Sequence, residues 1–431
     1  MQRLVWAWRR RGRGEDSSPE MLETRRNIRL LYSDIAWFGL LFGVSANFLV
    51  VFVARLDPSP WLVSVITSGP ALINIIWQLP AIRLTERLGN PRMVTVYSAL
   101  PNRLGFLLIA LVPLLIPSTW QAYAIVVIIL LQGFPTAIMV VAFQTMFTGL
   151  IPRHRMAEVV GMRNVFLGMS STIMAMICGV VLSVLPFPWG YQAIFFAGFL
   201  ASLGSIWSVW QLHTDHLETA PPPVVVAASH SNVQPQRDPN FVRFSLGSGA
   251  LHLGMFLSAP LFPLYWIGTL HLSDSWISVL ASTLTLTSVV GAFGMRAIGQ
   301  RMSLSVVMVI SSLLFGLYPI LTAVLGHPWL LVAVTAFSGT WSGVINVALF
   351  NSLAELCPPD KRARYIGVWT WLMNIAIFAA PLVGAALAEV TGVVPALMIA
   401  GAFRVLAAFI FWRFPFVSWE RHVASLTSTP V

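Results

Sequence analysis

Long apolar stretches alternate with short polar connectors along the whole chain. A transmembrane helix needs about 20 consecutive, mostly apolar residues, and twelve stretches meet that length. The first six predicted spans are 31–54, 60–82, 93–116, 120–147, 159–185 and 190–212. The second six are 242–267, 274–295, 304–325, 328–352, 365–388 and 393–414. The pattern therefore predicts an all-α integral membrane protein with twelve transmembrane helices.

The composition supports a membrane protein. Of the 431 residues, 57% are hydrophobic and only 10% are charged, whereas a soluble domain keeps about 25% of its residues charged. The net charge of +10 comes mostly from arginines that lie between apolar runs, so it does not indicate a nucleic-acid partner. The two cysteines, Cys178 and Cys357, fall in separate predicted segments and form neither a disulfide framework nor a metal-binding spacing.

One long polar stretch, 213–240, divides the predicted spans six and six, and it contains three consecutive prolines. Such a composition is typical of a linker. The stretch 213–240 is therefore predicted to be a linker. At the N-terminus we predict a basic segment, and the helix after it is predicted to start at Ser18–Pro19, because proline favours the first helical position. The predicted units are a cytoplasmic basic segment (1–29), a six-helix bundle (30–212), a cytoplasmic linker (213–240), a second six-helix bundle (241–414) and a cytoplasmic tail (415–431).

Basic residues gather on alternate connectors. They occupy the second, fourth, eighth and tenth connectors and the central linker, whereas the other connectors carry only Arg55. Lys and Arg stay on the cytoplasmic side of a membrane, so both termini are predicted to be cytoplasmic in a multi-pass protein of the bacterial inner membrane. The opposite span ends carry tryptophans, as an interfacial aromatic belt does: Trp61, Trp120, Trp189, Trp266 and Trp329.

The two halves repeat weakly. FQTMFTGLIPRHRMAEVVG follows the fourth span and FNSLAELCPPDKRARYIGV follows the tenth, which aligns Arg155 with Arg362. A nearly equal shift aligns Arg83 with Arg296 after the second and eighth spans. Parallel repeats of six spans place a binding site at their interface near the middle of the bilayer.

The segment IRLTERLGNPR, from Ile82 to Arg92, resembles the loop signature of the major facilitator superfamily, roughly G-x-L-A-D-R-x-G-R-[RK]. Leu84, Arg87 and Gly89 match it, and Glu86 stands where the family has Asp. Ile82 replaces the first Gly, and the family's antiporter motif in span five, G-x-x-x-G-P, is missing. With the six-plus-six pattern, the resemblance extends from about Asn27 to Pro415. It implies the major facilitator fold, in a bacterial subfamily, acting as a monomer.

In that family the loop charges form a cytoplasmic network that holds one conformation. The alternative interpretation is that these charges only set topology. Residues that the resemblance and the repeat assign to the network are Arg83, Glu86, Arg87, Gly89, Arg155, Arg296, Arg301 and Arg362.

Among the charged residues inside predicted spans, we single out three, because a charge there needs a partner or water. Asp34, near the cytoplasmic end of span one, is a candidate for proton or substrate coupling, or it pairs with a nearby arginine. Arg103 in span three is a second coupling candidate, with Asn102 as a neighbour able to satisfy it. Arg404 in span twelve is a weaker candidate, because this span flanks the cavity in the family.

Polar and aromatic residues in the other spans are candidates for the cavity lining, since amides and rings can hydrogen-bond and stack on a solute. They can equally hold helices together. The candidates are Asn47, Gln132, Gln144, His252, Ser338, Thr340, Trp341, Asn346, Trp371 and Asn374.

The functional hypothesis is secondary active transport of a small solute by alternating access, either coupled to protons or as facilitated diffusion. The chain lacks a nucleotide-binding P-loop, paired carboxylates and metal spacing, so we expect neither an enzyme nor a cofactor. A transporter-like sensor or scaffold is the main alternative, and a membrane-embedded transferase is a weaker one.

Overall fold

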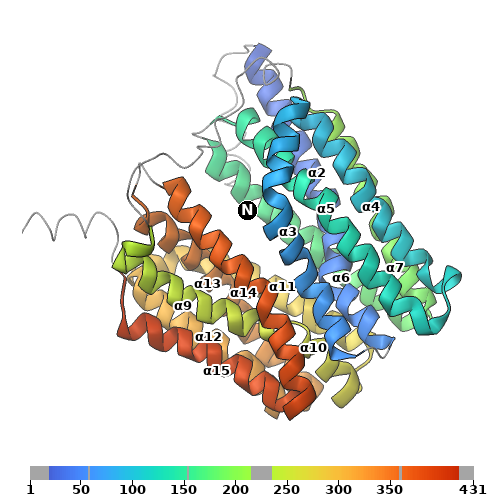
Figure 1. The fold of residues 1–431 in the computed structure, drawn as a ribbon, viewed down its shortest axis with the longest axis vertical. Helices are drawn as coiled ribbons and strands as arrows, with labels where there is room; N and C mark the ends of the chain where they lie inside the picture. The colour runs from blue at the N-terminus through green and yellow to red at the C-terminus, as the bar shows by residue number, and fades with distance from the viewer. Residues whose placement is uncertain (1–18, 57–58, 153–154, 215–234, 359–361, 417–431) are drawn as a thin grey trace, which may run out of the picture.

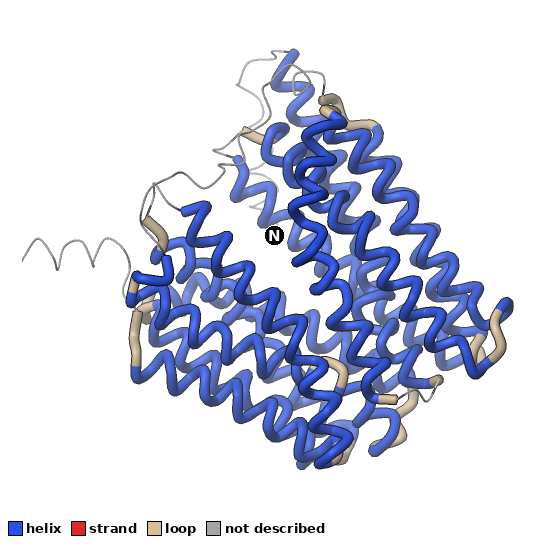
Figure 2. The backbone as a smooth tube through the Cα atoms, in the orientation of Figure 1, coloured by secondary structure: helices blue, strands red, loops and turns tan. Residues whose placement is uncertain are grey.

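The computed structural model describes residues 19–56, 59–152, 155–214, 235–358 and 362–416. Within these ranges the chain is helical and contains no β-strand (Figure 2). They hold twelve helical spans long and apolar enough to cross a membrane, as the hydrophobic pattern predicts. Three of the predicted units lie mostly outside the described residues: residues 1–18 of the basic segment, 215–234 of the linker and 417–431 of the tail.

The first bundle consists of α2 (Pro19–Arg55), α3 (Pro60–Leu88), α4 (Pro91–Leu115), α5 (Ser118–Leu150), α6 (Met156–Val184) and α7 (Trp189–Trp210). The second follows a short helix, η2 (Pro235–Arg237), and begins with α9 (Pro239–Ser258), α10 (Leu261–Leu264) and η3 (Tyr265–Thr269). It continues with α11 (Asp274–Gly299), α12 (Leu304–Val324), α13 (Pro328–Leu356), α14 (Arg362–Thr391) and α15 (Val393–Arg413). Helix α2 begins at Pro19, as predicted.

The seventh span differs from the single helix predicted over 242–267. It starts earlier, at Pro239, because the side chain of Asp238 accepts hydrogen bonds from the backbone N–H groups of Asn240 and Phe241 and caps the helix. It is also broken after Ser258, and the chain continues as the short α10 and the π-helical η3. Pro260 and Pro263 lack backbone N–H groups, so two helical hydrogen bonds are missing at this break.

The packing within the two bundles follows one pattern. In the first, α2 packs against α6 and α7, while α5 packs against α3 and α4. In the second, α9 packs against α14 and α15, while α13 packs against α11 and α12. These are equivalent pairs when spans one to six are aligned with spans seven to twelve. The weak repeat in the sequence therefore corresponds to a repeat in three dimensions.

The bundles meet along two helix pairs, α3 with α14 and α6 with α11. We call the end where α7 stops and α9 starts the linker face, and the end where α2 stops and α11 starts the distal face. In Figure 1 the bundles lie close together at the distal end, near α10, and diverge toward the linker face. Trp120, Trp189 and Trp329 are exposed at the distal helix starts, as predicted for an aromatic belt.

Small residues line the contact between α6 and α11. A Cβ added to Gly179 would lie 2.5 Å from Cβ of Ser278, and one added to Gly168 would lie 3.0 Å from a methyl group of Val289. Helices approach closely in membranes when their facing residues are small. The two helices therefore approach closely at these two positions.

The buried cores show where the halves join. One core belongs to both halves and lies toward the distal face, with Phe52 and Phe195 from the first bundle and Leu272, Ile277 and Leu280 from the second. Toward the linker face each bundle has a core of its own. The first contains Leu31, Met146 and Val209, and the second contains Phe244, Leu349 and Phe411. The halves are thus packed together distally and separately at the linker face.

Candidate functional site

A polar bridge joins the two halves at the distal face. Arg55, the last residue of α2, donates from Nε and Nη2 to Oδ1 of Asp274 over 3.0 and 2.8 Å. Its Nη2 also donates to the carbonyl of Leu272 over 2.8 Å. The hydroxyl of Tyr191, from α7, donates to the same carboxylate oxygen over 2.9 Å. We call Arg55, Asp274 and Tyr191 the distal latch.

Helix geometry supports this latch. Arg55 lies at the C-terminus of α2 and Asp274 in the first turn of α11, where the partial charges of helix ends favour a cation and an anion respectively. Their side chains are 25% and 16% exposed. A second inter-half hydrogen bond runs from Nε1 of Trp61, at the start of α3, to Oε2 of Glu389 near the end of α14, over 2.8 Å. The sequence analysis did not identify Asp274 and Tyr191. The signal that could have found them was Arg55, because an isolated arginine among connectors without other basic residues needs a counter-charge.

Asp34 lies in a buried ion pair inside the first bundle. Its Oδ2 is 3.2 Å from Nη1 of Arg163 on α6, and its Oδ1 accepts a hydrogen bond from Ser205 of α7 over 2.7 Å. The Arg163 guanidinium also lies over the rings of Phe143 and Phe147. A buried carboxylate needs such partners to remain charged. The coupling role of Asp34 remains a prediction, and its partner Arg163 had not been singled out.

Arg103 is held by its chain neighbour, as expected. Its Nη1 donates to Oδ1 of Asn102 over 2.7 Å, and its guanidinium lies 5.1 Å from the ring centre of Phe38. Asn102 in turn donates to Thr136 over 2.7 Å, and Gln132 donates to the carbonyl of Asn102 over 2.6 Å. Gln132 thus lies buried between α4 and α5, where it links two helices.

Arg404 lies in the core of the second bundle, between α9, α12 and α15. It donates from Nη2 to Ser258 over 2.5 Å and from Nη1 to the carbonyl of Phe315 over 3.4 Å. Its guanidinium lies 4.4 Å from the ring centre of Phe315, and the residue is 2% exposed. These contacts hold three helices of one bundle together.

Aromatic and polar groups meet between α9 and α14. The Nδ1 atom of His252 lies 2.8 Å from the carbonyl of Ser248, and its ring contacts Phe256 and, edge-on, Trp369. Two buried polar atoms here have no hydrogen-bond partner among the described residues: Oγ of Ser248 and Nε1 of Trp369. Water or a bound molecule can satisfy such an atom, and atoms of this kind also occur elsewhere in both halves, as at Ser64 and Ser338. Sequence reasoning found His252 but not Trp369, which lies two positions from the chosen Trp371.

The other cavity candidates are dispersed. Several already bond to their own helix, including Asn47 to Gly43, Thr340 to Ala336 and Asn346 to Ser342. Ser338 is fully buried, Gln144 and Trp371 are exposed, and Trp341 and Asn374 are half-buried. Exposure alone does not separate a water-filled cavity from lipid, so their predicted role remains a prediction.

At the linker face, Arg83, Glu86 and Arg87 are exposed side chains of the last turns of α3. Gly89 ends this helix with a left-handed φ of 69°, a conformation that favours glycine. Arg155 lies 3.8 Å from Glu158 of the same half, and Arg301 is exposed. The side chains of Arg296 and Arg362 lie outside the described residues. Between described side chains, no ion pair joins the two halves at this face.

Two matched six-helix bundles, joined at one membrane face, define a polytopic α-helical membrane protein of the two-bundle transporter class. The model of the Major Facilitator Superfamily matches residues 35–238 and 244–429, and the chain belongs to this family. No curated protein matches the chain.

Solved structures show the same fold. A variant of the nucleoside transporter NupG is 14% identical, with a TM-score of 0.68 over 90% of this chain and 100% of that one. A D-xylose–proton symporter is 14% identical, with a TM-score of 0.65 over 92% and 97%. A bacterial homologue of the human lysosomal transporter Spinster is 13% identical, with a TM-score of 0.58 over 92% and 97%. At these identities the likeness concerns the fold alone.

Proposed function

We propose that this protein moves a small solute across the membrane by alternating access, and that the described conformation is the one closed at the distal face. The observation that carries the proposal is the contrast between the two faces. At the distal face the latch and a shared core join the halves, whereas at the linker face each half has its own core. Such an arrangement can close at one end while the other end opens.

The alternation of arginines supports a cytoplasmic linker face, and with that orientation the proposed conformation is inward-facing. The distal latch then takes the role of holding this state, while the loop charges around Arg87 are available to hold the opposite one. An ion pair that forms in only one of two states biases their ratio by its own interaction free energy, and about 1.4 kcal/mol corresponds to a factor of ten.

The groups between α9 and α14 are the best-supported binding site. His252 and Trp369 offer ring faces, and Ser248 and Trp369 offer polar atoms that lack partners among the described residues. Rings beside hydrogen-bonding groups suit an uncharged polar solute with a flat or cyclic body. The nucleoside and sugar transporters of similar fold support solutes of this kind. Proton coupling through Asp34 belongs to the proposal as one mode, and facilitated diffusion as the other.

Liposome flux tests the function. Purified protein is first screened by thermal shift against nucleosides, sugars and aromatic amines, and hits are then tested for uptake and counterflow with and without a pH gradient. We expect saturable flux of at least one neutral polar solute, which Trp369→Phe weakens. Binding without flux in either direction would favour a sensor and contradict the proposed transport.

A further inference from the structure

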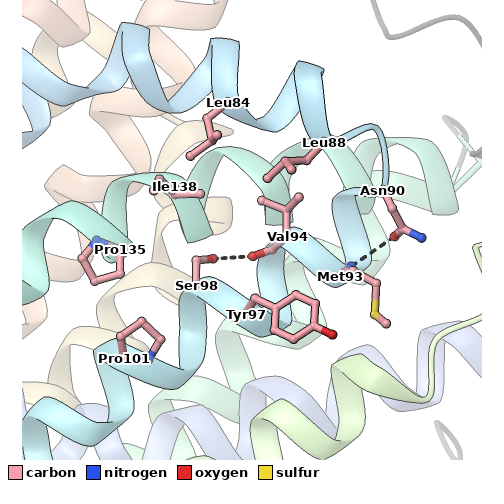
Figure 3. A pocket seen from close by; sticks show the side chains of 10 residues that line it. All are labelled: Leu84, Leu88, Asn90, Met93, Val94, Tyr97, Ser98, Pro101, Pro135 and Ile138. Carbon is pink, nitrogen blue, oxygen red and sulfur yellow. Dashed lines mark hydrogen bonds between the residues drawn. The ribbon is translucent and has the colours of Figure 1, made fainter.

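A groove opens on the side of the first bundle near the linker face. Helices α3 and α4 are consecutive, yet each packs on α5 and they barely touch one another. Between them lies a groove of about 470 Å³ (Figure 3). Its walls include Leu84 and Leu88 of α3, Tyr97 and Pro101 of α4, and Ile138 of α5.

The groove lies on the surface that faces lipid. Each of its three helices carries exposed apolar side chains that continue from the groove toward the middle of the span, where an apolar surface faces hydrocarbon. These side chains are Leu72 and Ile76 on α3, Leu104 and Leu108 on α4, and Val127 and Leu131 on α5. An acyl chain of the bilayer can therefore enter the groove without crossing protein.

The walls suit hydrocarbon better than a polar ligand. The hydroxyl of Ser98 donates to the carbonyl of Val94 over 2.6 Å, and the side-chain oxygen of Asn90 accepts from the backbone N–H of Met93 over 3.1 Å (Figure 3). These polar groups are already used by the chain itself. Tyr97 is 65% exposed at the edge, and tyrosine rings favour the boundary between acyl chains and headgroups.

Two arginines, Arg83 and Arg87, lie in the last turns of α3 toward the linker face. Arg83 and Arg87 are next in sequence to the groove residues Leu84 and Leu88, in the same last turns of α3, where the exposed Glu86 also lies. Neither forms an ion pair with a described residue, and both are exposed. Arg92, in contrast, donates to the carbonyl of Leu212 over 2.7 Å. Arginines beside an interhelical groove on the cytoplasmic side suit a lipid phosphate.

From this geometry we infer that the groove binds one anionic phospholipid, with an acyl chain between α3 and α4 and the phosphate at Arg83 and Arg87. Helix α3 also packs against α14 of the second half. The lipid would therefore contact a helix that belongs to the interface between halves. This site is separate from the solute site between α9 and α14 and does not depend on it.

Native mass spectrometry of the full chain tests the site, with phosphatidylglycerol, phosphatidylcholine and palmitate added to delipidated protein. Wild type should bind one phosphatidylglycerol at least tenfold more tightly than phosphatidylcholine. Ile138→Trp fills the groove and should lower phosphatidylglycerol binding at least tenfold. Leu406→Trp, at an exposed apolar position on α15 of the second half, is the control and should bind like wild type.

The headgroup contact has its own variants. Joint Arg83→Gln and Arg87→Gln substitution should remove the preference for phosphatidylglycerol, whereas Arg301→Gln, an exposed arginine of the second half, should preserve it. If Ile138→Trp is not monodisperse, Leu84→Trp fills the groove from its outer wall instead. The inference is overturned if a folded groove-filling variant binds phosphatidylglycerol like wild type. It is overturned equally if palmitate binds as tightly as phosphatidylglycerol, because any anionic end on one acyl chain would then suffice and no phospholipid would be selected.

Discussion

The guanidinium of Arg55 lies 2.8 Å from the carboxylate of Asp274, although 219 residues separate the two along the chain. Tyr191 donates to the same carboxylate oxygen, so helices from both halves meet at one atom. Among the described residues, Arg55 is the only Lys or Arg at the distal connectors, and the contact compensates its charge across the interface. A partly exposed ion pair contributes about 0–1 kcal/mol when isolated, and more when a hydrogen-bonding network shields it from water.

Asp274→Asn should open the distal face more often, because the amide keeps the carboxylate's shape but loses its charge. Cys178 is a built-in reporter, since it is fully buried in the shared core. In a Cys357→Ser background its alkylation by a small maleimide should accelerate roughly tenfold if the latch contributes about 1.4 kcal/mol. The rate can be followed by intact-mass spectrometry.

Glu158→Gln is the matched control for this experiment. It removes the 3.8 Å contact with Arg155, which lies within one half, and should leave the Cys178 rate unchanged. Arg55→Ala combined with Asp274→Asn should accelerate alkylation no more than the stronger single variant, because the two residues act as one pair. Equal rates in Asp274→Asn and wild type would show that the latch does not hold the distal face closed.

Asp34→Asn should abolish flux driven by a pH gradient but leave counterflow exchange, if the carboxylate carries the proton. The measurement is uptake into liposomes with and without the gradient. Ser205→Ala removes one hydrogen bond from the same carboxylate and keeps its charge, so gradient-driven flux should persist in that variant. Unchanged gradient-driven flux in Asp34→Asn would leave Asp34 only its structural pairing with Arg163.

Arg404→Met should preserve folding and transport, because a buried charge is often replaced without loss by an apolar side chain of similar volume. Ser258→Ala should be worse: it deprives the buried guanidinium of its hydroxyl acceptor, at a cost of about 1–3 kcal/mol. The comparison is of melting temperatures in detergent. A larger loss in Arg404→Met than in Ser258→Ala would point to a role for the arginine beyond packing.

Trp369→Phe should raise the KM for the transported solute about tenfold, since it removes the indole N–H and retains an aromatic ring. The melting temperature should change little, because this N–H has no partner among the described residues. Trp412→Phe, a change at a 66% exposed position on α15, serves as the control. Equal KM values for the two variants would exclude Trp369 from the binding site.

The helices could be predicted from the sequence because bilayer thickness imposes a minimum apolar length on every span. Predicted starts at 60, 274, 304, 328 and 393 coincide with those of α3, α11, α12, α13 and α15. Span seven was predicted less well. Its hydropathy is continuous, so the pattern hides the break at Pro260 and Pro263, and the early start depends on a capping aspartate that lies within the predicted linker.

The candidate site was less predictable than the fold. Asp34 and Arg103 were found as charges inside apolar runs, but their partners depend on how distant helices pack. Arg163 approaches Asp34 only because α6 lies against α2, and Asp274 meets Arg55 only across the interface of the halves. A hydropathy pattern fixes which residues enter the membrane, but not which helix faces each of them.

At two points of the contact between α6 and α11 there is no α6 side chain, since Gly168 faces Val289 and Gly179 faces Ser278. Interdigitated side chains must separate before one helix can move along another. A helix surface formed by glycine can move past its neighbour without this separation. At these two glycines, rotation of one half against the other meets less steric resistance than a bulky side chain would impose. The ratio of inward-facing to outward-facing forms would then depend on a few polar contacts at the distal face and the linker face. Point mutations can remove these contacts one at a time.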